Sequence, residues 1–582
     1  MRSRLVFILF LFIFFSLLLS FNPDQVKASE HLVHNIDTGL GYITIQDAIN
    51  DPQTQNGHTI FVEEGVYCEH VTVNKSLSLI GADQSNTVID GNYSGNVVNI
   101  TADNVEITGF TIQNSGHDSY HGVYSTSNNN SISHNTIVNN GDGIKIYKSS
   151  NNSVSGNFVV NNDYGVALSW YCDNNSISGN NITSSEYGIF LHTCSDSFLQ
   201  GNLLNGNQYG FGVEGFELNH YFASIDTSNL VDGNPIYYLI NQQELTINKA
   251  THPQIGFLAL INSTDISVEN VNLTKNKQGV LLAYTNNTTI KNNTIVNNDD
   301  GIYLYNSSNN DISLNNITLN NHDGIKIYLS SNNSISENNI TTNNYDGIFL
   351  SRSSNNNISL NSITFNNDDG IRLYRFCDHN CISRNNITNS KYGIGLPYCN
   401  NNSITENNIM ENRFGVHVSV SSNHSITGNS ITANIDYGIY LHKSYNNSII
   451  GNEIADNGIG IRFQSSLDNV IYENNIVDNT ESVYDDSWDP FEPHSPIPSI
   501  NTWDDGHQRG NYWSDFRERY PNATELDNSG IWDTPYIIDN NNKDNYPIIP
   551  EFPSITILVL LLTITIAVVT IYNRIIVTSK RK

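Results

Sequence analysis

Acidic, basic and aromatic residues recur at fixed distances from a repeated glycine in this 582-residue chain. An aspartate directly precedes the glycine in four successive repeats, and several repeats place a cation two residues after it and a tyrosine four residues after it. Carboxylates, cations and aromatic rings on one surface are typical of sites that hold sugars, by ring stacking and charge-assisted hydrogen bonds. The carbohydrate-binding candidates are Asp300, Asp323, Asp346, Lys326, Tyr305, Tyr328 and Tyr374.

Asp368, Asp369 and Arg372 depart most from the repeat and are the candidate catalytic set. Carboxylates beside an arginine could serve a lyase or glycosidase, in which calcium or paired carboxylates act on a uronate or glycosidic bond. The alternative is structural, because Asp-Gly is favourable turn chemistry before a strand. Repetition favours the structural alternative, since these acids are part of the repeat and an active site interrupts one.

Four of the six cysteines form two pairs spaced by 22 residues, Cys172 with Cys194 and Cys377 with Cys399. If 22 residues make one coil of a stack, the members of each pair lie on neighbouring coils ~4.8 Å apart. That separation is within the Cα range of a disulfide, and disulfides are the favoured interpretation outside the cytoplasm.

Two metal sites are alternatives to a purely structural role. A thiolate–imidazole cluster could bind copper or zinc, and acidic residues of a C-terminal loop could bind calcium. The copper or zinc candidates are Cys377, His379, Cys381 and Cys399, and the calcium candidates are Asp527 and Asp533.

The elements that position these residues follow from the glycine period. Sixteen glycines from Gly122 to Gly460 recur every 21 to 23 residues, which is 338 residues in 15 steps. The period is kept between Gly210 and Gly279, which places Gly233 and Gly256 in the same series. A fixed period of this length indicates stacked repeats.

Each repeat contains three short apolar segments separated by Asn, Ser, Asp and Gly. Residues alternate within a segment, as in Ile325 and Ile327 against Lys326 and Tyr328, which predicts strands. Three strands per coil predict an all-β, single-stranded, right-handed parallel β-helix, with crossovers of the usual hand. The apolar columns should line its interior, and stacked asparagines should form turns and hydrogen-bonded ladders.

The two ends of the chain have their own signals. An apolar segment preceded by Arg2 and Arg4 predicts a secretory signal, and an 18-residue apolar run followed by basic residues predicts a membrane span with the coils outside the cell. Residues 42–50 predict a short amphipathic helix that covers the open end of the coils. The expected domains are a signal peptide (1–28), an N-terminal helical cap (29–60), the β-helix (61–480), a C-terminal cap or module (481–553), a transmembrane anchor (554–573) and a basic cytoplasmic tail (574–582).

Several separate motifs resemble the NosD-like right-handed parallel β-helix proteins. They are TIQDAIN, TIFVEEGVYCEHVTVNKSLSLIGAD, the DGI and NNSI repeats, LVDGNPIYYLINQQ and the tail GNYWSDF…DTPYIID…DNYPI, and PEFP is similar to archaeal surface-sorting tails. The resemblance covers residues 40 to 572. It implies a pectate-lyase-like solenoid, the carbohydrate-binding or sugar-hydrolase superfamily and, from the family label, periplasmic copper-site maturation.

The net charge of −30 disfavours nucleic acid and anionic membrane surfaces as partners. Together these features predict an exported archaeal cell-surface protein that is anchored at its C-terminus and binds polysaccharide or a neighbouring cell-envelope protein. The alternatives are a polysaccharide lyase, hydrolase or uronate epimerase, a NosD-like copper-handling protein, and a structural spacer or adhesin. Twenty-two Asn-x-Ser/Thr sequons also make some glycosylation plausible.

Overall fold

The computed structural model describes residues 32–117, 119–486 and 498–549, which fold mainly into coils of short parallel strands. The chain divides into two compact units, Met1–Asp163 and Tyr164–Lys582. Ile325 pairs with Ile348 and Ile327 with Leu350 in parallel register, so residues 23 apart in the chain are vertical neighbours. The predicted all-β parallel solenoid is therefore confirmed.

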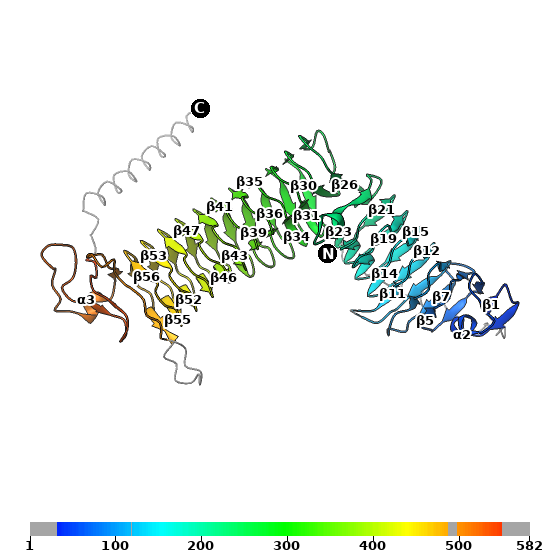
Figure 1. Cartoon of the computed structure of the whole chain (residues 1–582), viewed down its shortest axis with the longest axis horizontal. Coiled ribbons are helices and arrows are strands. Elements are labelled where there is room, and N and C mark those ends of the chain that lie inside the picture. The colour runs from blue at the N-terminus through cyan, green and yellow to red at the C-terminus, as the bar shows by residue number, and fades with distance from the viewer. Residues whose placement is uncertain (1–31, 118, 487–497, 550–582) are drawn as a thin grey trace, which may run out of the picture. The chain divides into compact units, whose positions relative to one another are not determined.

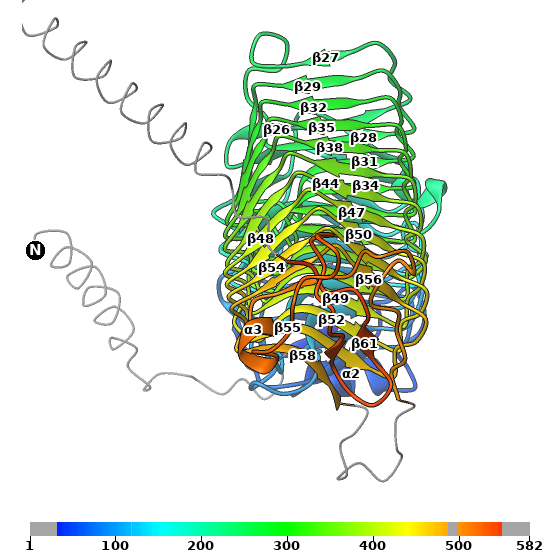
Figure 2. The same ribbon diagram turned by 90° about the vertical axis from the view of Figure 1, so that its left-hand side faces the viewer.

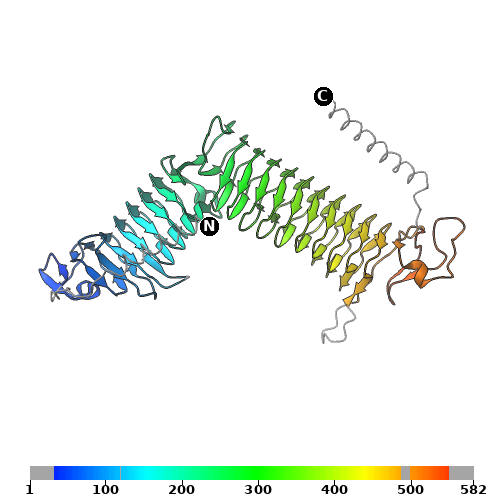
Figure 3. The same ribbon diagram turned by 180° about the vertical axis from the view of Figure 1, so that it is seen from behind.

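The first unit begins with an antiparallel segment and continues as parallel coils, drawn in blue and cyan in Figure 3. Strand β1 (Val33–Asn35) pairs antiparallel with β2 (Leu40–Tyr42) and with β3 (Thr59–Val62). Three columns of parallel strands follow. The first column contains β3, β6 (Ser78–Gly81), β9 (Glu106–Thr108), β12 (Ser131–Ser133) and β15 (Ser153–Ser155), and the second contains β4 (Gly65–Tyr67), β7 (Thr87–Asp90), β10 (Thr111–Gln113), β13 (Thr136–Val138) and β16 (Phe158–Val160). The third column contains β5 (Val71–Val73), β8 (Val98–Ile100), β11 (His121–Ser125) and β14 (Asp142–Tyr147).

A short helix, α2 (Ile45–Asn50), lies near the start of the first unit. The Thr44 side chain accepts a hydrogen bond from the backbone N–H of Asp47, which is a favourable N-cap. Ile45, Ala48 and Ile49 are fully buried on one face of this helix, beside β1, β2, β3 and β5.

The second unit carries a column formed by the first strand of each coil, which Figure 1 shows side by side from β31 to β55. All of its members except β58 begin at or beside a glycine. They are β17 (Tyr164–Ser169), β20 (Tyr187–His192), β23 (Tyr209–Glu214), β26 (Asn234–Ile240), β28 (Phe257–Ile261), β31 (Gln278–Ala283), β34 (Asp300–Tyr305), β37 (Ile325–Tyr328), β40 (Ile348–Ser351), β43 (Asp369–Tyr374), β46 (Tyr392–Pro397), β49 (Phe414–Ser419), β52 (Tyr437–His442), β55 (Ile459–Gln464) and β58 (Glu481–Asp485).

Two further columns complete the coils of the second unit, and Figure 2 shows rungs such as β29, β32 and β35 stacked in order. The second strands are β18 (Ser176–Ser178), β21 (Ser197–Gln200), β24 (Ala223–Ile225), β27 (Thr246–Ile247), β29 (Ser267–Glu269), β32 (Thr289–Lys291), β35 (Asp311–Ser313), β38 (Ser334–Ser336), β41 (Asn357–Ser359), β44 (Cys381–Ser383), β47 (Ser403–Thr405), β50 (Ser425–Thr427), β53 (Ser448–Ile450) and β56 (Val470–Tyr472). The third strands are β19 (Asn181–Thr183), β22 (Leu203–Asn205), β25 (Leu230–Val231), β30 (Asn272–Thr274), β33 (Thr294–Val296), β36 (Asn316–Thr318), β39 (Asn339–Thr341), β42 (Ser362–Thr364), β45 (Asn386–Thr388), β48 (Asn408–Met410), β51 (Ser430–Thr432), β54 (Glu453–Ala455), β57 (Asn475–Val477) and β59 (Tyr512–Trp513).

The repeat is interrupted between β23 and β28, and no parallel pairing carries the three columns across this point. The parallel strands end at β23, β24 and β25 and begin again at β26, β27 and β30. The 3-10 helix η1 (Leu218–Tyr221) follows β23, and β25 turns back to pair antiparallel with β26. Gly233 lies in that turn at φ +79°, a left-handed conformation that suits glycine. The prediction that Gly233 belongs to the periodic series was therefore wrong. Its spacing matches the period, but it lies in a turn and not at the start of a strand of the coil.

The recurring glycines are needed because neighbouring coils approach closely at the start of the first strand. A Cβ on Gly324 would lie 2.6 Å from the backbone oxygen of Gly347, and one on Gly347 would lie 2.6 Å from that of Gly370. Such distances are sterically forbidden. The glycine period thus records a stack of backbone contacts rather than a series of turns.

Asparagine ladders run along the corners of the coils, as the sequence predicted. The side-chain amide of Asn338 donates to Oδ1 of Asn361 at 3.0 Å, and that of Asn361 donates to Oδ1 of Asn385 at 3.0 Å. The same Oδ1 of Asn361 also accepts the backbone N–H of Asn338. These buried amides satisfy backbone groups that the corners would otherwise leave unpaired.

Beyond β58 the coils end in an aromatic module. β59 still pairs in parallel with β57, and Asn474 still donates to Asn511. Trp503 and Trp513 are buried against the end of the apolar core, and the short helix α3 (Phe516–Arg519) and the hairpin of β60 (Tyr536–Ile537) and β61 (Lys543–Asp544) follow.

No helix within the described ranges 32–117, 119–486 and 498–549 has the length and apolarity to cross a membrane. The predicted signal peptide (1–28) and transmembrane anchor (554–573) lie outside these ranges.

Candidate functional site

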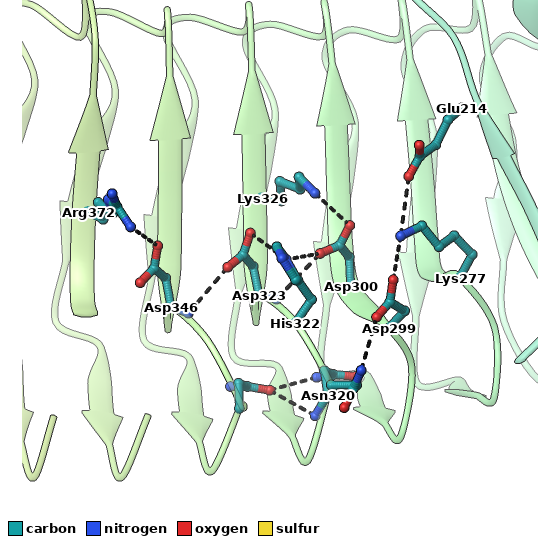
Figure 4. Close-up of polar contacts among 12 residues, drawn as sticks. Glu214, Lys277, Asp299, Asp300, Asn320, His322, Asp323, Lys326, Asp346 and Arg372 are labelled. Carbon is teal, nitrogen blue, oxygen red and sulfur yellow. Dashed lines mark hydrogen bonds and ion pairs between the residues drawn. The ribbon is translucent and has the colours of Figure 1, made fainter. Parts of the chain in front are cut away.

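The outward side chains of the first-strand column form the candidate site. Asp300, Asp323, Asp346 and Asp369, here named the acid column, lie on four successive coils, as predicted. All four are buried, with Asp300 fully enclosed and Asp369 4% exposed. Figure 4 shows Asp300, Asp323 and Asp346 of this column with their partners, together with the neighbouring Glu214, Lys277 and Asp299.

The first two acids share cationic partners. Asp300 contacts Lys326 Nζ at 3.0 Å and His322 Nδ1 at 3.1 Å, and His322 also lies 3.2 Å from Asp323. Burial favours the neutral form of Asp300, but Lys326 and His322 outweigh it and lower its pKa. Burial would lower the pKa of His322, but its hydrogen bonds to Asp300 and Asp323 raise it to about 10. The aspartate and histidine are thus held as ions.

A second ion-pair cluster lies beside these acids. Lys277 Nζ is 3.3 Å from Glu214 and pairs with Asp299 as well. Burial opposes the charge of Lys277, but the surrounding carboxylates raise its pKa.

Three of the four acids also bond the backbone of the next coil. The carboxylates of Asp300, Asp323 and Asp346 accept the backbone N–H of Asp323, Asp346 and Asp369 at 3.4, 3.2 and 2.9 Å. This role is structural, but it is a hydrogen bond between coils rather than the turn that the sequence suggested. It accounts for repetition of the aspartate without any ligand.

Asp369 ends the acid column and has different surroundings. Its carboxylate lies over Gly395, where a Cβ would be 2.5 Å from Oδ2. Arg372 contacts Asp346, Asp368 and Asp369 at 3.9, 3.6 and 3.8 Å. Burial and the neighbouring charge of Asp368 raise the pKa of Asp369 to about 7, and burial and Asp369 raise that of Asp346. The predicted catalytic set is therefore brought together.

The predicted tyrosines have unequal access to solvent. Tyr305 stacks on Tyr328 at 5.6 Å, but it is only 3% exposed. Its hydroxyl donates to the backbone oxygen of Phe216 at 2.6 Å, and Tyr221 of η1 packs against its ring. The interruption of the repeat therefore covers Tyr305, which corrects the expectation of an outward surface there. Tyr328 and Tyr374 remain half-buried.

An aromatic column continues the acid column in the same register. Asp369 pairs with Tyr392, Tyr392 with Phe414, and Phe414 with Tyr437. The rings stack at 4.6 and 5.2 Å. The sequence interpretation missed this column, although an aromatic residue replaces aspartate before the glycine in these repeats.

A second row of rings and a set of cations border the aromatic column. His417 stacks between Tyr392 and Tyr440, each at 5.1 Å. Lys391, Arg413 and Arg462 lie 5.3, 5.1 and 4.7 Å from the centres of Tyr392, Phe414 and Tyr437. We name the acid column and the aromatic column together the acid–aromatic strip.

The two cysteine pairs are neighbours but are not bonded. All six cysteines are free thiols in the structure. The hydrogen bond to Cys377, together with burial, raises the pKa of Cys399. Cys377 and Cys399 occupy an interior column of hydroxyl side chains, in which Cys399 N–H donates to Ser421 Oγ at 3.0 Å. Each thiol donates to a backbone carbonyl, as a serine does there, and a disulfide within either pair stays a prediction.

The proposed metal ligands do not converge. Cys377 and Cys399 are buried inside the coils, whereas His379 is exposed and Cys381 is half-buried on β44. Asp533 instead accepts hydrogen bonds from Thr524, and Asp527 is exposed. Among the described residues, two groups of three or more side chains have ligand atoms within 4.8 Å of one another. They are Asp300, His322 and Asp323, and Asp346, Asp368 and Asp369. Neither group contains a thiol, so the donors present do not form the thiolate site predicted for copper.

The chain is similar to a curated protein over a short segment and to solved structures at low sequence identity. A segment of 81 residues is 40% identical to a "Cell surface glycoprotein" of Methanothermus fervidus, covering 14% of this chain and 13% of that protein. The periplasmic alginate epimerase AlgG aligns with 12% identity, 74% and 84% coverage and a TM-score of 0.29. The Azotobacter vinelandii mannuronan C-5 epimerase AlgE6 A-module gives 12% identity, 66% and 93% coverage and a TM-score of 0.24. These TM-scores carry no argument about activity.

Two family models match the chain. "Right handed beta helix region" matches residues 256–395. "Periplasmic copper-binding protein (NosD)" matches residues 49–250 and 406–518, more than half of the chain. With the parallel coils described above, these matches show that the chain belongs to the NosD family of right-handed parallel β-helix proteins.

Proposed function

We propose that this protein is an envelope or cell-surface β-helix that binds an extended polysaccharide along the acid–aromatic strip. The periplasmic family and the cell-surface relative support the location. The observation that carries the binding proposal is the continuous stack of Tyr392, Phe414 and Tyr437 on three successive coils. A regular ladder of half-buried rings bordered by cations suits a polymer of sugar units.

The ends of the chain complete this proposal. The apolar run from Ile555 to Tyr572, followed by basic residues, would anchor the protein with its coils outside the cell. The helix α2 would cover the first coils, because three of its side chains are fully buried there.

Binding to a glycan array by the full chain tests the main proposal. Phe414→Ala removes the middle ring of the stack, and loss of ~1 kcal/mol of aromatic contact would weaken binding about fivefold. Phe365→Ala is the matched control, because Phe365 is 61% exposed outside the strip. Equal affinity of both variants and the wild type for every bound glycan, or no bound glycan at all, would contradict the proposal.

A second candidate function is acid–base catalysis on a polysaccharide at Asp368, Asp369 and Arg372. The favouring observation is the pKa of about 7 at Asp369, because a carboxyl group near neutrality can give and take a proton. Asp369→Asn would abolish cleavage or epimerisation of a uronate polymer while leaving its binding measurable. Turnover that survives this change would exclude Asp369 as the acid or base. The scattered cysteine and histidine donors give no comparable support to copper handling.

A further inference from the structure

The structure sorts the asparagines of this chain into two classes. Those of the corner ladders are buried, apart from Asn479 at the last rung, and none of these begins an Asn-x-Ser/Thr sequon. Conversely, none of the 22 sequon asparagines is among the buried residues. All of the sequon asparagines therefore belong to the accessible class, although both classes occur in the same repeat.

One corner of the coils repeats a single sequon geometry in the second unit. The sequon asparagine is exposed and left-handed, the next residue is buried, and the hydroxyl residue is half-buried at the start of the second strand. The asparagines of this corner are Asn174, Asn287, Asn332, Asn401, Asn423 and Asn446.

Asn332 illustrates why the amide is available. Its φ is +58°, which turns it out of the coil, and it is exposed. The adjacent Asn333 instead donates to Asn356 Oδ1 at 3.0 Å within the ladder. Ser334 begins β38 and is half-buried, which leaves the hydroxyl group of the sequon at the surface. The fold thus places an exposed amide that is available for modification directly before an amide that is bonded within the ladder.

We propose that this corner, named the sequon corner, carries N-linked glycans. In the reaction the Asn Nδ2 forms a bond to C1 of the first sugar of a lipid-phosphate-linked oligosaccharide. The C1–O bond to the phosphate breaks, the phosphate leaves with the bonding electrons, and the amide loses a proton to a base. This proposal requires export of the chain but not the binding function of the acid–aromatic strip.

The coil spacing limits which sites are filled together. Asn401, Asn423 and Asn446 precede β47, β50 and β53, which pair in register on successive coils. Their asparagines are therefore ~4.8 Å apart, too close for two bulky glycans side by side. Asn332 has more room, because Asn309 and Asn355 occupy the adjacent coils without a Ser or Thr two residues later.

Glycopeptide mass spectrometry of the full chain from its native producer tests both parts of the proposal. Digestion after lysine yields one peptide, residues 392–443, that contains both Asn401 and Asn423. We expect a glycan at Asn332, and at most one glycan on each copy of the 392–443 peptide. Ser334→Ala should remove the mass of one glycan at Asn332 while leaving the ladder amides in place. Asn309 and Asn355 are internal controls and should be unmodified.

Two results would overturn the inference. Unmodified asparagines throughout the sequon corner would refute glycosylation of this surface. A 392–443 peptide that carries glycans at both Asn401 and Asn423 as its main form would refute the spacing limit. Neither result depends on whether the acid–aromatic strip binds a polysaccharide.

Discussion

At the scale of single residues, Asp369 differs most from its equivalents in the acid column. The three preceding acids each accept a backbone N–H from the next coil. This bond lowers the cost of ionising Asp346, but burial and the neighbouring Asp369 still raise the pKa of Asp346. Asp369 instead has Arg372 as an ion-pair partner at 3.8 Å and lies beside Asp346 and Asp368. Burial and carboxylate repulsion therefore favour its neutral form.

The pH dependence of stability should report this difference. The pKa of Asp369 rises from 3.8 to about 7 on folding, so the folded state holds the proton more tightly. The free energy of unfolding should therefore fall as pH rises from about 4 to about 7, with no further contribution from Asp369 above that range. The groups facing it are Asp323, Asp346, Asp368, Arg372 and Lys391.

Asp369→Asn should flatten this part of the profile, measured as the urea midpoint between pH 4 and pH 8. Asp265→Asn, at an exposed corner, is the matched control and should leave the profile as it is. An unchanged slope in Asp369→Asn would show that the carboxyl group is already ionised throughout this range.

At the scale of the coil, sequence and structure agree where the repeat is regular. The alternation of residues 325–328 correctly predicted which side chains face inward. The period of 22–23 residues correctly predicted which residues of successive coils lie next to each other. The aspartates could be placed on one column, but their burial could not be read from the repeat. Tyr305 is covered by Phe216 and Tyr221. These two residues belong to the segment that interrupts the repeat, so the periodic pattern could not predict the contact.

The asparagine ladder should be costly to break at a single rung. Asn361→Ala removes an amide that donates to Asn385 and Ile335 and accepts twice from Asn338. Asn385 would keep the backbone N–H of residue 361, and the Asn338 amide would keep Ile312. The buried backbone N–H of Asn338 and the oxygen of Ile335 would lose their Asn361 partner, so we expect a loss of roughly 3 kcal/mol in the free energy of unfolding.

Asn367→Ala is the control for this ladder variant, because Asn367 is exposed one residue beyond the ladder amide of Asn366. Its effect should stay within about 0.5 kcal/mol. Urea denaturation of both variants makes the comparison. Equal midpoints would mean that the ladder amides are replaced by water at no net cost.

At the scale of the whole molecule, a coil contacts only its neighbours, so each open end of a stack is a place where unfolding can begin. The C-terminal end of the second unit is closed by large aromatic side chains. Trp513 is 1% exposed, stacks on Tyr536 at 4.0 Å and donates from Nε1 to Asp544 at 2.9 Å. Trp503 and Phe516 belong to the same buried cluster.

Trp513→Ala should therefore destabilise the end of the stack before its middle. Truncating a buried tryptophan costs about 3–5 kcal/mol, and in a stack this loss falls mainly on the adjoining coils. Hydrogen exchange should accelerate in β54 to β57 while β34 to β40 keep their protection. Trp170→Ala, at a side chain 39% exposed, serves as the control. Equal acceleration along the second unit would instead show that its coils unfold as one cooperative body, and that the aromatic module contributes to global rather than terminal stability.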